Sequence, residues 1–167
     1  MNCAETLRQS GFSGKITMVC QEKVVPYDRT LLSKALSNGD ASKFGLRDDD
    51  FLKNADIEYV LGDRAFSVKP EERKVITNQG KKFVYDKLMI ATGSSAWKPD
   101  VAGINLKGVH SLRSAEDHAN IKQACANATN VVIIGGSFIG SECAASLKMH
   151  FKDAVNIVVV NANETPF

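Results

Sequence analysis

The chain has 167 residues, of which 44% are hydrophobic and 24% are charged, an ordinary composition for a globular protein of one domain or two small ones. Its net charge of +2 is too small to indicate a nucleic-acid or membrane-surface partner. No apolar run reaches the roughly 18 residues of a membrane span, and the N-terminus lacks the basic-then-apolar pattern of a secretory signal.

The first 55 residues predict helices around one short strand. Residues 1–14 are typical of the later turns of a helix that stops at Gly11, and residues 15–20 form a short buried strand. A short helix is expected over 30–36, followed by a turn-rich linker at 37–45. Residues 47–55 predict another helix, whose acidic start at 48–50 suits the positive end of a helix dipole. A metal cluster is the alternative interpretation of these acids.

The middle of the chain predicts short strands, and its last third predicts a new unit. Strand patterns cover 57–62, 64–70, 74–78, 81–85 and 87–93, with Asn78–Gly80 as a hairpin turn. A helix follows over 114–128, with Ser114 as its N-cap and Asp117 at its third position. A strand at 130–135, a helix at 138–150 and a strand at 155–161 then complete a β-α-β unit.

The four cysteines, Cys3, Cys20, Cys125 and Cys143, have no C-x-x-C spacing. A disulfide framework, a zinc site or a redox-active pair is therefore not expected. We interpret all four as small apolar residues within helix and strand patterns. The histidines at 110, 118 and 150 fit no catalytic pattern and are interpreted as surface or satisfied core residues.

The turn between residues 134 and 141 has the pattern of a dinucleotide-binding loop. Such a loop joins a strand to a helix N-terminus that faces the pyrophosphate. Gly135 makes the turn and Gly140 lets helix and strand pack closely, whereas Ser137 stands at the middle glycine position, where its hydroxyl can donate to a phosphate. Asn161 ends the next strand, where an acid binds the ribose in NAD sites. A tight turn that binds nothing is the alternative.

Several segments together resemble one family. Residues 3–16 ("CAETLRQSGFSGKI") are similar to the helix and second strand of an FAD-binding Rossmann unit, "VPYDRTLLSKAL" to a "PYDRPxLSKxL" segment, and "LMIATGSSAWKP" to an ATG segment. "GVHSLRSAEDHANI" resembles a connector into an NAD domain, and "GGSFIGSECAA" and "ETPF" resemble its β-α-β unit. The chain thus resembles the FAD-dependent pyridine-nucleotide oxidoreductases, in the ferredoxin-reductase and apoptosis-inducing-factor branch that includes Rieske-associated members.

The resemblance implies site residues of two kinds. It implies catalytic roles for Lys34, near flavin N5, and for Glu142, near the nicotinamide. It implies cofactor contacts for Glu22, Arg29, Lys34, Ala91, Thr92, Gly93, Gly135, Gly136, Ser137, Phe138, Ile139, Gly140 and Asn161, and no metal ligand. Phe138 would cover the flavin face, on the same helix face as Glu142. Thr30 and Trp97 depart from the family pattern, and the neutral Asn161 indicates tolerance of a 2′-phosphate.

The resemblance also implies the fold and its partition. We expect an α/β chain: an incomplete FAD-binding Rossmann-like half-domain with an antiparallel β insertion over 1–105, then the first β-α-β unit of an NAD(P)-binding Rossmann domain over 106–167. We expect the strand and glycine loop that open the FAD half-domain to be missing from this chain. FAD and NAD(P) are the cofactors implied for the full-length family, whereas binding by this fragment alone is doubtful.

Three functional hypotheses follow. The first is a fragment of an FAD-dependent NAD(P)H oxidoreductase that passes electrons to a ferredoxin, a Rieske-like protein or another acceptor. The second is a degenerate, inactive homologue that serves as a scaffold subunit, and the third is a nucleotide-binding module limited to residues 131–160. The expected partners are the remaining domains or neighbouring subunits that complete the sheet, and an iron–sulfur acceptor. The compartment is open, with an intracellular location, cytoplasmic or mitochondrial, expected.

Overall fold

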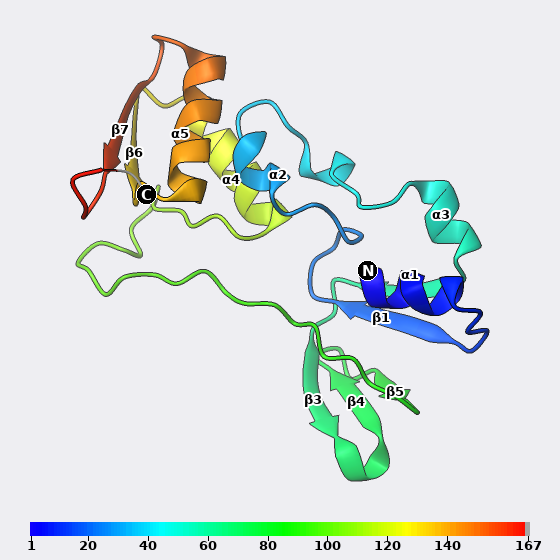
Figure 1. Cartoon of the computed structure of the whole chain (residues 1–167). Helices are drawn as coiled ribbons and strands as arrows, with labels where there is room; N and C mark the ends of the chain where they lie inside the picture. Colours follow the sequence, from blue (N-terminus) through cyan, green and yellow to red (C-terminus); the bar gives the residue numbers. More distant parts are fainter. Residues whose placement is uncertain (166–167) are drawn as a thin grey trace. The chain divides into compact units, whose positions relative to one another are not determined.

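The computed structural model describes residues 1–165 of the chain, which form two compact units (Figure 1). The first unit combines Met1–Tyr27 with Gly45–Ser94, and the second combines Asp28–Phe44 with residues 95–165. The segment Asp28–Phe44 is thus inserted between parts of the first unit in sequence but makes its contacts within the second. The domain boundary at residues 105/106 stays a prediction.

The first unit begins with a helix packed beside a parallel strand pair. It contains α1 (Asn2–Gln9), β1 (Ile16–Cys20), α3 (Asp49–Asn54) and β2 (Ile57–Leu61), and β1 pairs with β2 in parallel from Ile16↔Ile57 to Cys20↔Leu61. The predicted helix end is confirmed, since Gly11 has φ +82°, which glycine adopts without strain.

The guanidinium of Arg8 connects the turn after α1 with the turn after α3. Its Nε donates to the carbonyl of Ala55 and its Nη2 to that of Asp56, both at 2.7 Å. Its Nη1 donates to the carbonyls of Phe12 and Gly14 at 2.7 and 2.8 Å. One side chain thus satisfies carbonyls in the turn after α1 and in the turn after α3.

The acidic run before α3 acts as predicted for a helix start. The side chain of Asp48, the N-cap residue, accepts a 2.8 Å hydrogen bond from the backbone N–H of Phe51. Asp49 and Asp50 then occupy the first turn, where negative charge is favourable. No group of three or more metal-ligating side chains occurs within residues 1–165.

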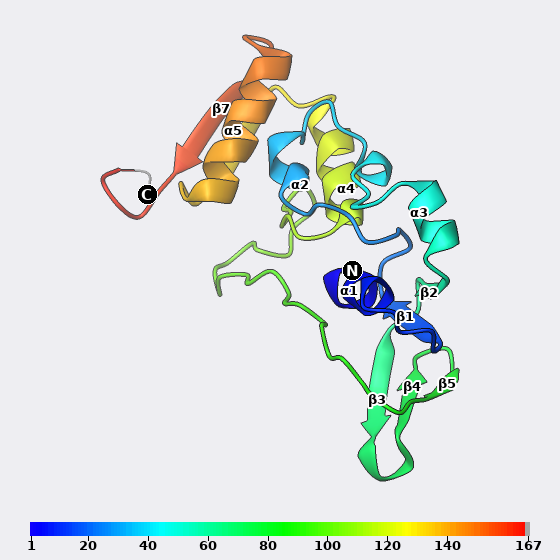
Figure 2. The same cartoon turned by 45° about the vertical axis from the view of Figure 1, so that its right-hand side comes forward.

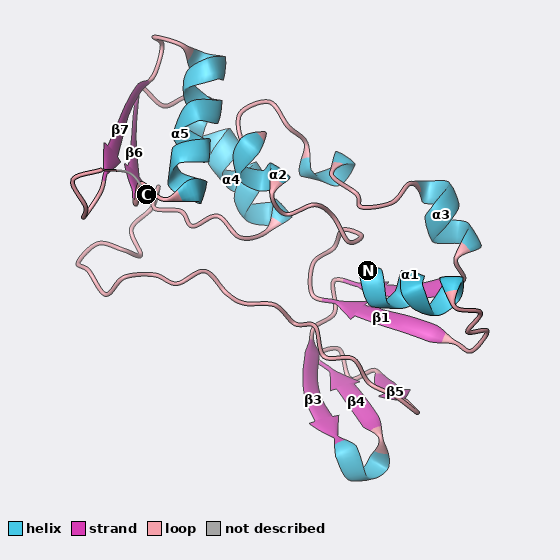
Figure 3. Ribbon diagram, viewed as in Figure 1, coloured by secondary structure: helices cyan, strands magenta, loops and turns pink. Residues whose placement is uncertain are grey.

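An antiparallel sheet completes the first unit, seen as strands in magenta in Figure 3. Its strands are β3 (Ala65–Lys69), β4 (Lys74–Thr77) and β5 (Lys82–Val84), with the short 3-10 helix η2 (Pro70–Glu72) between the first two. The predicted hairpin turn at Asn78–Gly80 is confirmed: Gly80 has φ +79° and its N–H donates to Thr77.

The prediction of a strand at 87–93 is wrong. Residues 87–93 form no strand, and Met89 and Ile90 are 67% and 68% exposed. An apolar run becomes a strand only where a neighbouring strand supplies hydrogen-bonding partners, and no strand within residues 1–165 pairs with this one.

The second unit contains the predicted β-α-β crossover. Its elements are α2 (Leu31–Lys34), the 3-10 helix η1 (Ala41–Lys43), α4 (Ala115–Cys125), β6 (Asn130–Ile134), α5 (Phe138–Phe151) and β7 (Asn156–Val160). β6 and β7 pair in parallel from Asn130↔Asn156 to Ile134↔Val160, with α5 as the connection between them (Figure 1). The chain is therefore an α/β protein with a Rossmann-type unit.

Small and aliphatic side chains form the core of the second unit. Leu36, Cys125, Cys143 and Leu147 are buried together, and Ile121 and Ile133 are among the side chains packed against them. Burial raises the pKa of the Cys143 thiol to about 11, and the charge of Glu142 acts in the same direction.

All four cysteines lie within helices or a strand, as predicted. Cys125 and Cys143 are buried, Cys20 is half-buried and Cys3 is exposed. α1 has only one buried residue, Ala4, so the neighbouring position turns away from the core.

The helix α4 starts as the sequence predicts. The hydroxyl of Ser114 accepts a 3.1 Å hydrogen bond from the N–H of Asp117, whose carboxylate accepts a 2.8 Å bond from the N–H of Ser114. This reciprocal pair is a capping box. Within residues 1–165, none of the helices combines the length and the apolar character needed to cross a bilayer.

Candidate functional site

A pocket of about 390 Å³ lies in the second unit where α2 meets α5 and the segment before α4. Both cartoon views place α2 beside α4 and α5 (Figures 1 and 2). The size is in the range of small-molecule and cofactor sites. The lining residues are Arg29, Thr30, Leu32, Ser33, Lys34, Leu112, Arg113, Phe138, Ile139 and Glu142.

Glu142, in the first turns of α5, joins two consecutive residues of α2. Ser33 Oγ donates to Glu142 Oε2 at 2.5 Å, and Lys34 Nζ lies 2.9 Å from Glu142 Oε1. The hydrogen bond from Ser33 and then that from Lys34 keep the pKa of the Glu142 carboxyl below its ordinary value. The pair therefore presents an ionised carboxylate and an ammonium at one end of the pocket.

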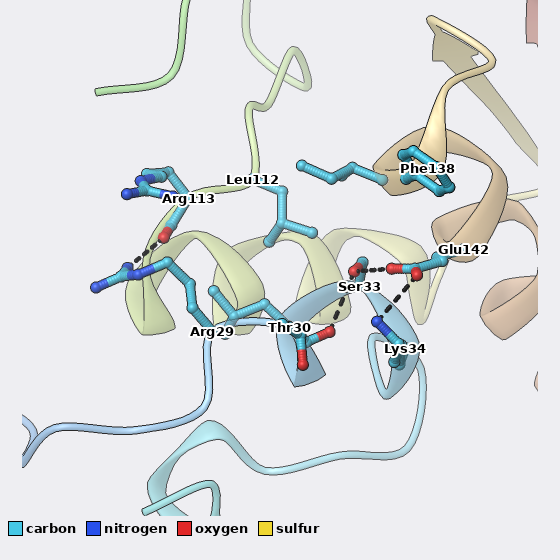
Figure 4. Close-up of a pocket in the computed structure, with 10 residues that line it drawn as sticks. Arg29, Thr30, Ser33, Lys34, Leu112, Arg113, Phe138 and Glu142 are labelled. Carbon is cyan, nitrogen blue, oxygen red and sulfur yellow. Dashed lines mark hydrogen bonds and ion pairs between the residues drawn. The ribbon is translucent and has the colours of Figure 1, made fainter. Parts of the chain in front are cut away.

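Two arginines lie at the opposite end of the pocket in Figure 4. Arg29 Nη1 donates a 2.5 Å hydrogen bond to the backbone carbonyl of Arg113. Among the lining residues in the described part of the chain, Glu142 is the one acid, against Arg29, Arg113 and Lys34. The pocket is thus cationic at the arginine end, which suits a phosphate-bearing ligand because guanidinium groups bind phosphate in a bidentate manner.

The apolar border of the pocket comes from the start of α5. Phe138 and Ile139 are 70% and 56% exposed, although both line the pocket together with Leu112. Phe138 and Glu142 were predicted to share a helix face, and their common place at this pocket confirms that prediction. A large exposed aromatic beside a pocket offers a flat surface for a planar ligand.

The glycine loop directly precedes α5. Gly135 has φ +103°, and a Cβ added there would meet nothing within 4 Å. A Cβ added at Gly140 would lie 1.9 Å from the carbonyl oxygen of Gly135, so only glycine lets the helix pass this close to the turn. Ser137 is the N-cap of α5, and its hydroxyl makes no capping bond. This geometry fits the turn, the close packing and the open helix N-terminus of a pyrophosphate loop.

Asn161 is hydrogen-bonded to the glycine loop. Its Oδ1 accepts a 3.1 Å hydrogen bond from the N–H of Gly136, and its Nδ2 donates to the carbonyls of Asn163 and Thr165 at 3.0 and 2.9 Å. The amide therefore connects the turn after β6 with the segment after β7. It adds no negative charge to the end of β7.

The other predicted cofactor residues belong to the first unit. Glu22 follows β1, and its Oε2 accepts a 2.7 Å hydrogen bond from the hydroxyl of Tyr27. Ala91, Thr92 and Gly93 are exposed and lie outside strands and helices, with Gly93 at φ +69°. Their roles stay predictions.

Sequence reasoning did not single out Ser33, Leu112 or Arg113. Ser33 precedes Lys34 in a short predicted helix, and its nearness to a proposed catalytic residue was a usable signal. Leu112 and Arg113 reach the pocket because α4 begins two residues later at Ala115, and no local pattern marks that position.

The chain matches the family described as pyridine nucleotide-disulphide oxidoreductase over residues 1–167. It is 37% identical over 165 residues to apoptosis-inducing factor 3 of Homo sapiens, which covers 99% of this chain and 26% of that protein. It is 34% identical over 165 residues to rhodocoxin reductase of Rhodococcus erythropolis, covering 98% of this chain and 38% of the relative.

The fold agrees with these relatives. A ferredoxin reductase for the CYP199A2 system from Rhodopseudomonas palustris superimposes with a TM-score of 0.84 at 34% identity, over 93% of this chain and 38% of that one. The chain thus spans between 26% and 38% of the length of these three proteins. Members of the family are FAD- and NAD(P)H-dependent reductases. Its sequence and its fold place the chain in the pyridine nucleotide-disulphide oxidoreductase family.

Proposed function

We propose that this chain is part of an FAD-dependent NAD(P)H oxidoreductase that passes electrons to a ferredoxin, a Rieske-like protein or a similar acceptor. The observation that carries the proposal is the Ser33–Glu142–Lys34 contact at a cationic pocket bordered by Phe138. A relative named rubredoxin-NAD(+) reductase from Pseudomonas putida, 35% identical over 148 residues, supports an iron-containing electron-transfer protein as the acceptor.

The pocket residues have distinct tasks in this proposal. FAD, when bound, would supply the conversion of a hydride into single electrons. Arg29 would bind its phosphates, and the ammonium of Lys34 would stabilise negative charge at the ring. Glu142 would stay ionised, orient Lys34 and lie near the nicotinamide, while Phe138 would cover the ring face and exclude water.

The glycine loop has the task of binding the second nucleotide. Gly135, Gly136, Ser137, Ile139 and Gly140 form the loop and helix start at which the NAD(P) pyrophosphate is bound, and Asn161 contacts the ribose. Glu22, Ala91, Thr92 and Gly93 contribute contacts to FAD from the first unit. On this proposal, residues 1–105 belong to an FAD-binding domain and residues 106–167 begin an NAD(P)-binding domain, within an intracellular protein of the cytoplasm or mitochondrion.

Two observations favour a second function, that of an inactive scaffold subunit. Asn161 accepts the hydrogen bond of the Gly136 N–H, a donor within the proposed pyrophosphate loop. Trp97 stands where members of the family often have a basic residue. A scaffold would keep the fold and use the remaining domains, or neighbouring subunits, to complete its sheets.

Flavin binding by the complete protein that contains this chain tests the proposal. We expect a yellow protein with absorbance near 450 nm, a property of the flavin itself, and NAD(P)H oxidation with ferricyanide or a reducible ferredoxin. Arg29→Ala weakens FAD binding, and Lys34→Met lowers turnover more than it weakens binding. The matched control is Arg47→Ala, which removes an exposed arginine bound to Glu5 in the first unit. A complete protein that folds, is colourless and takes up no FAD favours the scaffold and overturns the enzyme.

A further inference from the structure

Two side chains of α4 hold the backbone that follows α2. His118 Nε2 lies 3.2 Å from the carbonyl oxygen of Ala35, and Lys122 Nζ donates to the carbonyl oxygen of Gly39 at 2.7 Å. Because a carbonyl oxygen only accepts, the Nε2 proton of His118 is assigned from this contact. His118 and Lys122 are four residues apart, so both project from the same face of α4.

The His118 contact is enclosed in the second unit. The residue is 1% exposed, and its ring packs edge to face on Phe44 with 5.6 Å between ring centroids and an angle of 81°. A buried imidazole without a hydrogen-bonding partner is costly. The carbonyl of Ala35 therefore determines where the ring lies, and the ring in turn fixes the position of that carbonyl.

The helix α2 is too short to be stable without such contacts. α2 has 4 residues, well below the length at which an isolated helix is stable. α5 binds it from the other side: Glu142 bonds to Ser33 and Lys34, and one turn later the hydroxyl of Ser37 donates to the carbonyl of Ser146 at 2.9 Å. The α2 segment is thus fastened by side chains from two helices.

Lys34 lies at the end of this short helix, one residue before the carbonyl that His118 binds. The side chain of Lys34 is 52% exposed, so few neighbouring atoms fix it. Its pairing with Glu142 therefore depends on the position of the Lys34 Cα, which the backbone determines. α5 contacts the side chains of Ser33 and Lys34 and, through Ser146 Oγ, the backbone N–H of Ser37 at 3.3 Å. The contacts from α4 are to backbone carbonyls on the C-terminal side of Lys34.

We propose that His118 and Lys122 are positioning residues for Lys34: by binding the carbonyls of Ala35 and Gly39 they hold the ammonium of Lys34 at Glu142 and at the pocket. The proposal rests on the proposed role of Lys34 beside the flavin. Neither α4 side chain lines the pocket, so both act only through the α2 segment.

Three variants separate the hydrogen bond from packing. His118→Phe keeps an aromatic ring against Phe44 but removes the donor, whereas His118→Gln restores an amide donor of similar reach. Lys122→Met removes the ammonium and keeps an unbranched side chain that is one atom shorter. His110→Phe is the matched control, because His110 is exposed in the loop before α4.

The first readout needs no flavin. The pKa of Glu142 is measured by carboxylate ¹³C NMR in the full chain, with Lys34→Met giving the value without the ion pair. We expect His118→Phe and Lys122→Met to raise this pKa towards that of Lys34→Met, and His118→Gln and His110→Phe to leave it at the wild-type value. An unchanged pKa in both His118→Phe and Lys122→Met overturns the proposal. If His118→Phe does not fold, Lys122→Met alone decides.

The second readout is turnover of the FAD-loaded protein. We expect His118→Phe to lower kcat about tenfold and to change the KM for the nicotinamide nucleotide less than about twofold, the pattern of a lost transition-state interaction. If Lys34→Met lowers kcat and His118→Phe does not, positioning is wrong while the proposed function stands. If Lys34→Met leaves kcat unchanged, the proposed role of Lys34 fails, and the pKa of Glu142 still decides the positioning.

Discussion

The hydroxyl of Ser33 donates a 2.5 Å hydrogen bond to Oε2 of Glu142, a residue 109 positions further along the chain. The ammonium of Lys34 lies 2.9 Å from the other carboxylate oxygen, so α2 supplies a donor to each oxygen. Hydrogen bonds to a charged acceptor are stronger than neutral ones, and these two keep the pKa of Glu142 below its ordinary value. The ionised carboxylate thereby joins α2 to α5.

The stability of the chain should depend on pH through this carboxylate. Because the folded-state pKa of Glu142 is lowered, its contribution is complete above the unfolded value of about 4.3 and is lost as the pH falls through the folded value. We expect Glu142→Gln to lower the free energy of unfolding by about 1 kcal/mol at neutral pH. Urea unfolding of both proteins at several pH values should show this difference shrinking in acid.

The control for this experiment is Glu71→Gln, which neutralises an exposed glutamate of η2 in the first unit. It should give no difference from wild type at any pH. A Glu142→Gln difference that stays constant from neutral to acid pH would show that the carboxylate acts through packing and not through its charge.

A methyl group has no room at Gly140 of α5. In an exposed helix interior, replacing glycine by alanine stabilises by about 1 kcal/mol, but here the new Cβ would lie 1.9 Å from the carbonyl oxygen of Gly135. We expect Gly140→Ala to destabilise by about 3 kcal/mol and to weaken nucleotide binding, since helix and loop must separate. Thermal unfolding measures the first effect and NAD(P)H titration the second.

Met149→Ala provides the comparison, because Met149 is on the same helix and 80% exposed. Its effect on stability should stay within about 0.5 kcal/mol. Equal stabilities of Gly140→Ala and wild type would mean that the turn at Gly135 moves away at little cost.

The elements that the sequence predicted correctly are those encoded by neighbouring residues. Ser114 and Asp117 satisfy each other's N–H groups across three positions, and Gly80 supplies the positive φ of the hairpin turn. The crossover from β6 to β7 follows from an apolar strand, a glycine turn and a helix in direct succession. In each case the physical cause lies within one turn or one connection.

The features that the sequence did not reveal depend on partners far along the chain. The contact of Ser33 with Glu142 and that of His118 with Ala35 join residues 109 and 83 positions apart, and no local pattern specifies either. The missing strand at 87–93 has the same cause, because its apolar pattern is correct but no strand in the described residues pairs with it. Periodicity reports which face is apolar and not what covers it.

The four cysteines should differ widely in reactivity. Cys3 is exposed, whereas Cys143 is buried with a thiol pKa raised to about 11, so at pH 8 only about one in a thousand Cys143 thiols is the reactive thiolate. Desolvation also raises the pKa of Cys20 and Cys125. Alkylation followed by mass spectrometry should modify Cys3 first and Cys143 only after denaturant is added. Early modification of Cys143 would contradict its burial in the core between α4 and α5.

Asn161 sets the charge at the end of β7, and its replacement should change the choice between NADH and NADPH. The amide accepts from Gly136 and donates to the carbonyls of Asn163 and Thr165. In Asn161→Asp the acceptor is retained, but a negative charge appears where a 2′-phosphate would lie. We therefore expect the NADH-to-NADPH ratio of kcat/KM to rise about tenfold or more, equivalent to about 1.4 kcal/mol, as measured by steady-state kinetics with each nucleotide.

The same substitution removes both amide donors, so a loss of stability must be separated from a change in preference. Asn161→Ala removes the donors without adding charge, and it should destabilise the loop while leaving the NADH-to-NADPH ratio near that of wild type. Asn163→Asp adds a charge two residues away and should shift the ratio less than Asn161→Asp does. A wild-type protein that already rejects NADPH would contradict the tolerance of a 2′-phosphate expected from the neutral Asn161. An unchanged ratio in Asn161→Asp would show that residue 161 does not contact the ribose, because a charge beside the 2′-phosphate cannot act equally on the two nucleotides.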